Sequence, residues 1–587
     1  MTLLNDLSRL VGEAFAAEGL AARWGEVVVS QRPELAQFQC NGALAAAKES
    51  ERNPRELGEA IAGRLASLEQ FAKVEVAGPG FINLTLSDEA IARHAQQAAD
   101  DPRLGTSTST PETVVVDYAG PNVAKAMHVG HLRATIIGDS LQRIFRFLGH
   151  KVIRDPHFGD WGFQMGLLIA ALAEEEPDLP YFDPELDGPY PDTSPVTLED
   201  LQTIYPQASE RAERDEAFAA RARQATVDLQ QGRPGYLALW RHMKRVSEES
   251  QRRDFADLGV EFDLWYGESD VADRLGPLVE RLRESGMAIE SRGALIVPVD
   301  LPDDKRDLPP LILETSVGGY LYSTTDLATL EMRAVDLGAD LILYVVDARQ
   351  ADHFEQISRA ARRAGLIPAT TRLEHIRFGT MNSKDGRPFR TRAGGVVSLR
   401  DLIDLVKEAA QTRLNEAEIA KGYPEEERER IAHQVGLAAL KFGDLINNRQ
   451  SDYVFDLERF SSLEGKTGPY LQYGAVRIRS IQRRAAERDL RPGPLLPPEV
   501  EAERTLMLEL LRAPEVVERG AELRAPNHIA EYAYQVAATW NRFYDTCHIL
   551  DESDPHRQAS WLALAGWTLS TLTIMLGLLG IEVPERM

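Results

Sequence analysis

The chain has 587 residues, of which 43% are hydrophobic and 27% charged, so it can form several packed domains and is neither disordered nor collagen-like. Its formal net charge of −25 excludes a uniformly basic coat for nucleic acid, although it does not exclude a local basic patch. The two cysteines, Cys40 and Cys547, cannot build a disulfide framework or a cysteine-based zinc site. These features, with no apolar signal segment at the start, predict a cytoplasmic protein.

Residues 1–108 have the pattern of a small α+β domain. Leucines near the start recur at helical spacing, whereas residues 73–76 and 81–86 alternate like two strands joined by a Gly-Pro-Gly turn. A cluster of Ser, Thr, Pro and Gly at residues 105–111 predicts the linker that leaves this domain.

An α/β pattern follows the linker. Residues 114–118 are a short apolar run typical of a buried strand, and apolar residues at helical spacing then lead to Gly149, a favourable helix C-terminus. A second strand begins directly afterwards. This β-α-β order predicts a Rossmann-type parallel sheet in a catalytic domain of residues 109–400, interrupted by an insertion at roughly 171–295.

The remainder of the chain reads as long amphipathic helices. We expect a helical connector at residues 401–455 and an all-α helical bundle at 456–587. Residues 558–581 carry no charge and are long enough to cross a bilayer. Several polar residues inside this stretch, and the absence of a basic cluster beside it, favour a helix buried in the bundle, so we expect no membrane contact.

The sharpest motif is His128-Val129-Gly130-His131, which follows a predicted strand and opens a helix. The two histidines are three apart and fall on the same side of the first turn, and Gly130 lets a ligand approach the backbone. A helix N-terminus offers unpaired N–H groups and a positive dipole end. The motif therefore predicts a site for nucleotide phosphates, where preorganised donors promote attack on an α-phosphate. The alternative is a helix start with two incidental histidines.

Two further regions are basic. A glycine-bounded loop at residues 384–395 contains several cations and could close on phosphates, although such a loop is usually just solvated. Six arginines within residues 477–491, beside Tyr470 and Tyr473, could neutralise RNA phosphates and stack bases, and residues 540–544 add a second aromatic and basic cluster. For this arginine-rich segment the alternative is a solvated amphipathic helix.

These motifs resemble the class I aminoacyl-tRNA synthetases and, among them, the arginyl-tRNA synthetase family. The His128–His131 motif matches the H-x-G-H signature of the class, and the loop at 384–395 looks like a diverged form of its second, lysine-bearing signature. The resemblance covers essentially the whole chain and extends to residues 39–42, 76–80, 157–164, 322–326, 347–350 and 583–587.

The resemblance implies a reaction. Arginine and ATP give arginyl-adenylate and pyrophosphate, and the arginyl group then passes to the terminal ribose of the tRNA for arginine. It implies Mg²⁺ accompanying the ATP, first-step activity that needs bound tRNA, and no protein-held metal. We also expect a monomer.

The resemblance assigns roles to individual residues. The catalytic residues it implies are His128, His131 and Lys125, the last standing in for the lysine missing from the second signature. ATP is expected at Gly130, His128, His131, Lys384, Arg390 and Arg392. Arginine is expected at Asp117, Asn122, Tyr322, Asp326 and Gln350. The tRNA is expected at Phe38, Asn41, Tyr470, Tyr473, Arg477, Arg484, Trp540 and Met587.

Physical chemistry independently favours part of the arginine pocket. A guanidinium group prefers carboxylates in bidentate geometry, and Asp117 ends a strand at the sheet edge where ligands of such folds bind. Tyr322 and Asp326 are four apart at a predicted helix start, so they can point the same way. The alternative for Asp326 is helix capping.

The sequence departs from the family in two places. Phe38 stands where tyrosine is expected, and Arg387 and Arg390 stand where lysine is common, so the division of labour in the second signature is open. Two other functions also remain open: an H-x-G-H nucleotidyltransferase and a catalytically silent RNA-binding relative of the synthetases.

Overall fold

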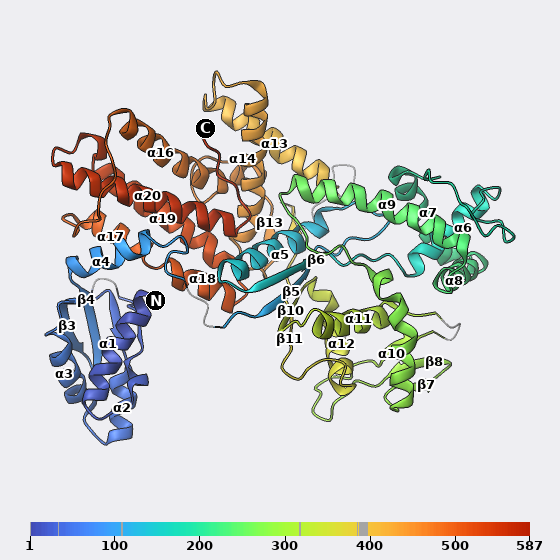
Figure 1. Cartoon of the computed structure of the whole chain (residues 1–587), viewed down its shortest axis with the longest axis horizontal. Helices are drawn as coiled ribbons and strands as arrows, with labels where there is room; N and C mark the ends of the chain where they lie inside the picture. The colour runs from blue at the N-terminus through green and yellow to red at the C-terminus, as the bar shows by residue number, and fades with distance from the viewer. Residues whose placement is uncertain (1, 33–34, 107–109, 316–318, 384–385, 387–396) are drawn as a thin grey trace.

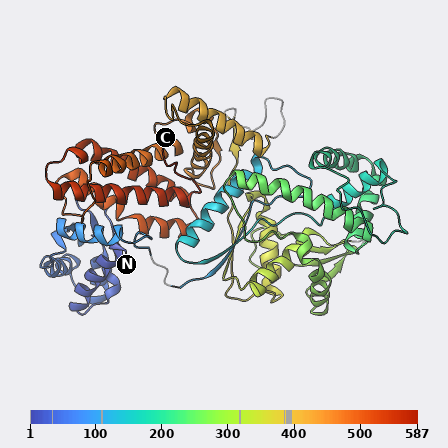
Figure 2. The ribbon, with the colours of Figure 1, turned by 45° about the horizontal axis from the view of Figure 1, so that its top comes forward.

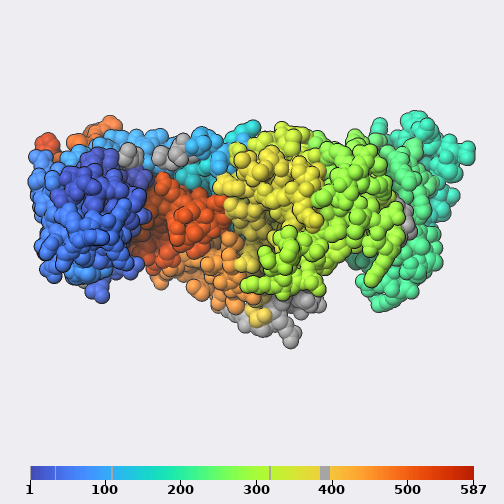
Figure 3. Space-filling model, turned by 90° about the horizontal axis from the view of Figure 1, so that it is seen from below, coloured from blue at the N-terminus to red at the C-terminus, as the bar shows by residue number. Residues whose placement is uncertain are grey.

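The computed structural model describes residues 2–32, 35–106, 110–315, 319–383, 386 and 397–587. The molecule is elongated (Figures 1 and 3). The N-terminal and C-terminal domains lie together at one end, the parallel sheet lies near the middle, and the inserted helices form the other end (Figure 2). The predicted sequence of an α+β domain, a parallel-sheet domain with an insertion, and a helical bundle is confirmed.

The N-terminal domain packs helices against one antiparallel sheet of strand order β1-β2-β4-β3. Its helix α4 also touches the C-terminal domain, where the Leu495 N–H donates to Gln96 over 2.8 Å. The elements are α1 (Leu3–Ala17), β1 (Val27–Val29), β2 (Phe38–Cys40), α2 (Gly42–Ser50), α3 (Pro54–Leu65), β3 (Phe71–Ala77), β4 (Phe81–Leu86) and α4 (Asp88–Ala99).

The central sheet has four parallel strands in the order β11-β10-β5-β6. Apolar side chains cover both faces, as the apolar run at residues 114–118 predicts, because helices pack on each side. The bounds are β5 (Thr113–Tyr118), β6 (Lys151–Asp155), β10 (Leu341–Val345) and β11 (Arg372–His375).

Helix α5 (Val129–Phe147) connects β5 to β6 and crosses the sheet closely. At Gly138 an added Cβ would lie 2.2 Å from Tyr118 Cγ, so a residue without a side chain is required there. The helix ends at Gly149 with φ +91°, whose N–H donates to the Arg146 carbonyl over 2.9 Å. The predicted C-terminal glycine is thus confirmed.

The insertion lies between β6 and β10. The predicted insertion start near residue 171 falls inside α6 (Phe163–Glu175), because that helix is continuous and already packs against α8. A small antiparallel sheet, β7-β8-β9, follows the inserted helices. The elements are α7 (Leu198–Arg214), α8 (Glu216–Gln230), α9 (Pro234–Asp257), α10 (Ala272–Glu284), β7 (Ile289–Ser291), β8 (Ala294–Val297) and β9 (Leu311–Glu314). Helices α11 (Tyr322–Glu331) and α12 (Ala351–Arg363) then flank β10.

The C-terminal part is helical apart from the short pair β12 (Met381–Asn382) and β13 (Tyr453–Val454). The predicted connector consists of two helices that pack on each other, and the second also packs on α5 and on the bundle. The helices are α13 (Leu399–Glu416), α14 (Glu425–Leu445), α15 (Leu457–Phe460), α16 (Gly468–Glu487), α17 (Glu501–Leu510), α18 (Ala513–Glu522), α19 (Asn527–Thr546) and α20 (Pro555–Leu578).

Helix α20 contains most of the uncharged stretch at residues 558–581. In the described part of the chain it is the one helix long and apolar enough to cross a membrane. Most of its most apolar stretch is buried inside the protein, against α16 and α19 of the bundle and against α5. Its apolar composition therefore has an explanation in the packing of the bundle.

Buried polar contacts fix α5 to the C-terminal part. Arg133 pairs with Asp444 of α14 over 3.0 Å, and both side chains are at most 3% exposed. Arg133 also donates to the Gly379 carbonyl over 2.7 Å. Farther along, the Ser140 hydroxyl donates to the Leu578 carbonyl over 2.8 Å. The helix that begins with the two histidines is therefore attached to the bundle along its length.

Replacing Gly138 by alanine should destabilise the protein. The new methyl group would overlap the Tyr118 ring, and overpacking of this kind costs roughly 1–3 kcal/mol. The matched control is Gly474→Ala in α16, where nothing lies within 4 Å of the added Cβ. That change should be neutral or stabilising by up to about 1 kcal/mol. Urea unfolding followed by fluorescence would reveal the difference, and equal midpoints for the two variants would contradict the close packing at Gly138.

Candidate active site

The loop between β5 and α5 is held by the insertion and by the segment that follows β6, where the Val123 N–H donates to the Gly159 carbonyl over 3.1 Å. It turns through positive φ angles at Ala119 and Gly120. The Ala124 N–H donates to the Ser247 hydroxyl over 3.0 Å, and the Gln251 amide donates to the Asn122 carbonyl over 2.9 Å. The insertion therefore positions the residues that precede the two histidines.

The two histidines lie together at the start of α5. Their ring centroids are 4.1 Å apart, and His128 is the N-cap residue of the helix. His128 Nδ1 accepts from the Gly130 N–H over 3.0 Å, and His131 Nδ1 accepts from the His128 N–H over 3.1 Å. An added Cβ at Gly130 would lie 2.7 Å from the His128 ring, so glycine is needed for this arrangement.

These hydrogen bonds define the tautomers. Because each Nδ1 accepts from a backbone N–H, each ring carries its proton on Nε2, which remains a donor. Burial and the neighbouring His128 lower the pKa of His131 to about 3, and burial and Lys125 lower the pKa of His128. Both imidazoles are therefore neutral at pH 7 and can offer two N–H donors at a helix N-terminus.

Lys125 lies over an aromatic ring of the insertion. Its ammonium group is 4.7 Å from the ring centroid of Tyr205 in α7, close enough for a cation–π interaction. It also acts electrostatically on both histidine rings. Lys125, the cation predicted to assist at the phosphates, is therefore near the two histidines. It packs on Tyr205, a residue without a role in the sequence-based prediction.

Asp326 does not cap a helix. Helix α11 begins at Tyr322, its N-cap is Leu321, and no side chain forms a capping bond there. Asp326 instead lies one turn inside the helix and pairs with His353 Nε2 over 2.6 Å. The Tyr322 ring is 5.0 Å from the His353 ring and is 61% exposed. The capping interpretation is wrong, because the N-cap is Leu321, five residues before Asp326.

Asp117 is already bound to a guanidinium group of the chain itself. Arg333 donates to Asp117 over 2.6 Å and to Asp155 over 2.6 Å, and its side chain is 1% exposed. Burial raises the pKa of Asp117, and Arg333 and His157 oppose that rise. The second oxygen, Oδ1, accepts no hydrogen bond from the residues that the structure describes. The prediction that Asp117 faces a substrate thus holds for one oxygen at most.

An acid that no sequence motif marks, Glu268, lies beside Asp326. Glu268 starts a short 3₁₀ helix (Glu268–Val271) and accepts from the Trp161 N–H over 3.1 Å. Burial, together with Asp160 and Asp326, raises the pKa of Glu268 to about 7. An acid with a raised pKa beside other carboxylates is typical of a functional site. Its sequence signal is weak, because one glutamate in a loop has no periodic pattern.

His157 was also not singled out as a site residue. Its backbone has φ +43°, unusual for a residue with a side chain, and its ring lies 3.9 Å from Asp155. Both ring nitrogens are buried without a hydrogen-bond partner among the described residues. Since His157 acts electrostatically on both Asp117 and Glu268, the acids at the strand ends share one neighbourhood.

The other predicted substrate residues lie near this region or outside the description. The Asn122 carboxamide oxygen is closely packed against Gly159, where an added Cβ would lie 2.3 Å from it. Gln350 is exposed at the end of a short 3₁₀ helix (Ala348–Gln350), immediately before α12. The predicted ATP residues Lys384, Arg390 and Arg392 lie outside the described residues.

Of the predicted RNA contacts, some are on the surface and others are buried. Arg477 lies 5.9 Å from the Tyr473 ring and 5.5 Å from the Tyr544 ring, so these three form an accessible aromatic and basic cluster. The Tyr470 hydroxyl accepts from Asn541 over 2.7 Å. Asn41 and Arg484 are exposed, and the half-buried Met587 packs beside α13 and α14.

Two of the predicted RNA contacts are placed in the packed interior. Phe38 is 6% exposed and lines the seam with α17, and Trp540 is 2% exposed in the bundle core. An aromatic ring needs an open face to stack on a base. These placements favour packing roles for Phe38 and Trp540.

Among the described residues there is no group of three or more His, Cys, Asp or Glu side chains that could hold a metal ion.

The neutral state of His131 can be tested by NMR on protein labelled at its histidine rings. The His131 signal, identified by its loss in His131→Ala, should not titrate between about pH 8 and pH 5, because its pKa lies below this range. Free histidine in the same sample serves as the pH reference. A His131 midpoint near that of free histidine would show that the ring is solvated and that the proposed donor geometry is wrong.

Three family models together cover most of the chain. The model described as "tRNA synthetases class I (R), catalytic domain" matches residues 95–457, "DALR anticodon binding domain" matches 471–587, and "Arginyl tRNA synthetase N terminal domain" matches 5–86. Their limits lie close to the three structural parts described above.

Full-length relatives agree with these models. The arginine–tRNA ligases of Maricaulis maris and Alkaliphilus oremlandii are 49% and 44% identical to this chain, with 100% of each sequence covered. The arginyl-tRNA synthetase structure from Plasmodium falciparum has a TM-score of 0.79 and 25% identity, covering 100% of this chain and 98% of that one. The Thermus thermophilus structure, at 24% identity and a TM-score of 0.79 with both chains covered completely, shares the fold. The chain belongs to the arginyl-tRNA synthetase family of the class I aminoacyl-tRNA synthetases.

Proposed function

We propose that this chain is an arginine–tRNA ligase. In the first step an oxygen of the arginine carboxylate attacks the α-phosphorus of ATP, which forms arginyl-adenylate and releases pyrophosphate. In the second step a hydroxyl of the terminal ribose of tRNA attacks the arginyl carbonyl, which forms the ester and releases AMP. The observation that supports this most directly is the pair of neutral imidazoles at the N-terminus of α5, the helix that follows β5 and its Asp117.

The two histidines suit the phosphate chemistry. Negative charge grows on the phosphoryl oxygens as the new bond forms, and fixed donors aimed at those oxygens stabilise it. His128 and His131 would supply two Nε2–H donors, and the start of α5 would add the positive end of its dipole. Lys125, held near these rings, would add a positive charge. Since the rings are neutral, they would act by hydrogen bonding and not by proton transfer.

The carboxylates suit a guanidinium substrate. Arginine is always charged, and its planar group donates in two directions, which acids on different elements can accept. Asp326, Glu268 and the free oxygen of Asp117 would meet the substrate, with Tyr322 beside Asp326. The bond between Arg333 and Asp117 is a guanidinium–carboxylate pair within this same site. We infer that Asn122 and Gln350 bind the α-amino and carboxylate end.

The RNA would bind elsewhere on the chain. The cluster of Tyr473, Arg477 and Tyr544 offers stacking surfaces beside a guanidinium group, and we assign it, with Tyr470 and Arg484, to the anticodon end. Asn41 of the N-terminal domain would contact another part of the tRNA, and Met587 would lie at the edge of the RNA surface. We further infer Mg²⁺ bound to ATP as part of that substrate, a monomer, and a cytoplasmic location.

Pyrophosphate exchange tests the proposed reaction. Labelled pyrophosphate should enter ATP when arginine and tRNA are both present, and it should enter little without tRNA, because the resemblance implies that tRNA completes the site. Each of the other amino acids, tested singly, is the control. Exchange with glutamine or cysteine in place of arginine would contradict the substrate assignment. Binding of tRNA without any exchange would instead support a catalytically silent relative.

Asp326→Asn should weaken arginine binding and leave ATP binding unchanged. The amide keeps the shape and the contact with His353 but lacks the charge, and losing a charged hydrogen bond costs roughly tenfold or more in affinity. The control is Asp347→Asn, whose carboxylate pairs with the exposed Arg349. The measurement is the KM for each substrate in pyrophosphate exchange. Equal losses for arginine and ATP would argue that Asp326 only supports the fold.

A further inference from the structure

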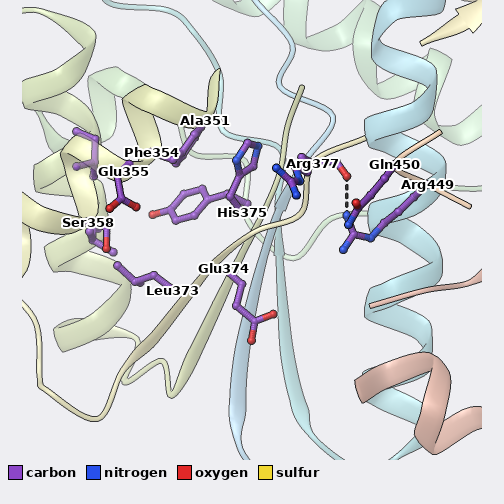
Figure 4. A pocket seen from close by; sticks show the side chains of 13 residues that line it. Ala351, Phe354, Glu355, Ser358, Leu373, Glu374, His375, Arg377, Arg449 and Gln450 are labelled. Atoms are coloured by element: carbon purple, nitrogen blue, oxygen red, sulfur yellow. Dashed lines mark hydrogen bonds between the residues drawn. The ribbon is translucent and has the colours of Figure 1, made fainter. Parts of the chain in front are cut away.

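A cavity of about 420 Å³ lies beside the edge strand of the central sheet. Its walls come from the end of β11, from α12, and from the segment that follows α14 (Figure 4). His375 and Arg377 approach it from the sheet, and Arg449 and Gln450 approach it from the C-terminal part. The cavity therefore lies where the catalytic domain meets the helical bundle.

Both acids of this cavity already contact arginines, although Arg359 is shared between Glu355 and Asp304. Glu374 is held by Arg524 through two hydrogen bonds of 2.8 Å, and Glu355 is held by Arg359 over 2.7 Å. Burial lowers the pKa of His375, so its ring is neutral at pH 7. The positive charge of the cavity therefore comes from the two arginines that form no ion pair among the described residues.

Arg449 and Arg377 are those arginines. Arg449 donates to the Arg377 carbonyl over 2.5 Å and to the Arg524 carbonyl over 2.8 Å, so backbone oxygens fix its plane without cancelling its charge. Burial and repulsion from Arg377 lower the pKa of Arg449, and attraction to Glu374 opposes that fall. Within the described chain, neither side chain has a carboxylate at ion-pair distance. The exposed Arg377 side chain adds a second positive charge.

The position of the cavity suggests a polyanion that spans two domains. The segment with α12 and the segments of the C-terminal domain lie side by side in Figure 3, on one face of the molecule. The histidine site belongs to the catalytic domain and the aromatic and basic cluster to the bundle, so a tRNA that reaches both would span the two parts that meet at this cavity. Because the whole chain has a net charge of −25, RNA backbone is repelled except where cations outnumber acids.

We propose that Arg377 and Arg449 bind one phosphodiester group of the bound tRNA at this seam. Guanidinium groups bind phosphate oxygens through paired N–H donors, and a fixed arginine beside an exposed one forms a prepared site for a single phosphate. This proposal rests on the function proposed above, since it names a contact to the same tRNA. It assigns no role in adenylate formation to either arginine.

The test is the salt dependence of tRNA binding to the full-length protein. Each phosphate contact contributes roughly one unit to the slope of log K against log salt. Arg377→Gln should therefore lower that slope by about one and weaken binding roughly three- to tenfold at low salt. Arg377→Lys should retain most of the slope because the charge remains. The KM for arginine and ATP at saturating tRNA should stay at the wild-type value.

The matched control is Arg372→Gln. Arg372 lies at the start of β11, five residues before Arg377, but pairs with Glu112 over 2.7 Å, so its removal should leave the slope unchanged. Arg449→Lys, which keeps the charge but loses the two fixed carbonyl bonds, should weaken binding less than Arg377→Gln does. Circular dichroism of each variant separates loss of binding from loss of fold.

Two outcomes would overturn the proposal. One is a wild-type slope and affinity for Arg377→Gln. The other is unchanged tRNA binding combined with weaker inhibition by pyrophosphate, which would make the cavity a site for a free phosphate. In both cases wild-type protein would still charge tRNA with arginine. Failure of the wild-type protein to charge any tRNA would instead reject the proposed function itself.

Discussion

A single buried guanidinium group organises the carboxyl edge of the sheet. Arg333 lies in a turn of π-helix (Met332–Asp336) that directly follows α11, and it pairs with Asp117 of β5 and Asp155 of β6. Without it, two acids would face each other in a region shielded from water, where an unpaired charge costs several kcal/mol. The two ion pairs of Arg333 also fix the distance between the strand ends and α11, which carries Tyr322 and Asp326. The arrangement of the acids thus depends on this one side chain.

The same arrangement makes the site selective by charge. Arg333 neutralises part of the acidic surface, and Glu268 has a pKa near 7, so the neighbourhood keeps a limited negative charge when it is empty. A cationic ligand would lower the pKa of Glu268, so that the ionised carboxylate would attract the ligand. An uncharged ligand would leave buried acids unpaired, which is costly. In the proposed site, rejection of neutral amino acids would therefore follow from the acids and would need no separate proofreading domain.

Much of this could be read from the sequence, for reasons that individual residues make clear. Local patterns determine local structure: the apolar run before Asp117, the helix that opens at His128, and the glycine that ends it were each predicted from neighbours a few positions away. The role of Asp326 was harder, because capping and ligand binding share the same spacing, and only the observed start of α11 at Tyr322 separates them. The burial of Phe38 and Trp540 depends on domain contacts that no local pattern encodes.

The partners that the sequence could not reveal are distant ones. Arg333 and Asp117 are 216 positions apart, and Arg449 meets Arg377 across 72 positions, so no periodicity links them. His157 and Glu268 have no pattern at all. His157 is recognised by buried ring nitrogens without a hydrogen-bond partner among the described residues, and Glu268 by its raised pKa, and both features exist only in the folded chain. Helical and strand spacing predicts elements, whereas a buried electrostatic site emerges when elements from separate regions meet.

The attachment of α5 to α20 has a mechanical consequence. Ser140 lies twelve positions after His128, and at 1.5 Å per residue this part of the helix is a stiff rod of roughly 18 Å. Its first end presents the imidazoles, and Ser140, seven residues before the helix ends, is bonded to the last turn of α20. A tilt of the terminal helix within the bundle would therefore swing the donors at the far end by a comparable distance, without any loop having to rearrange between them.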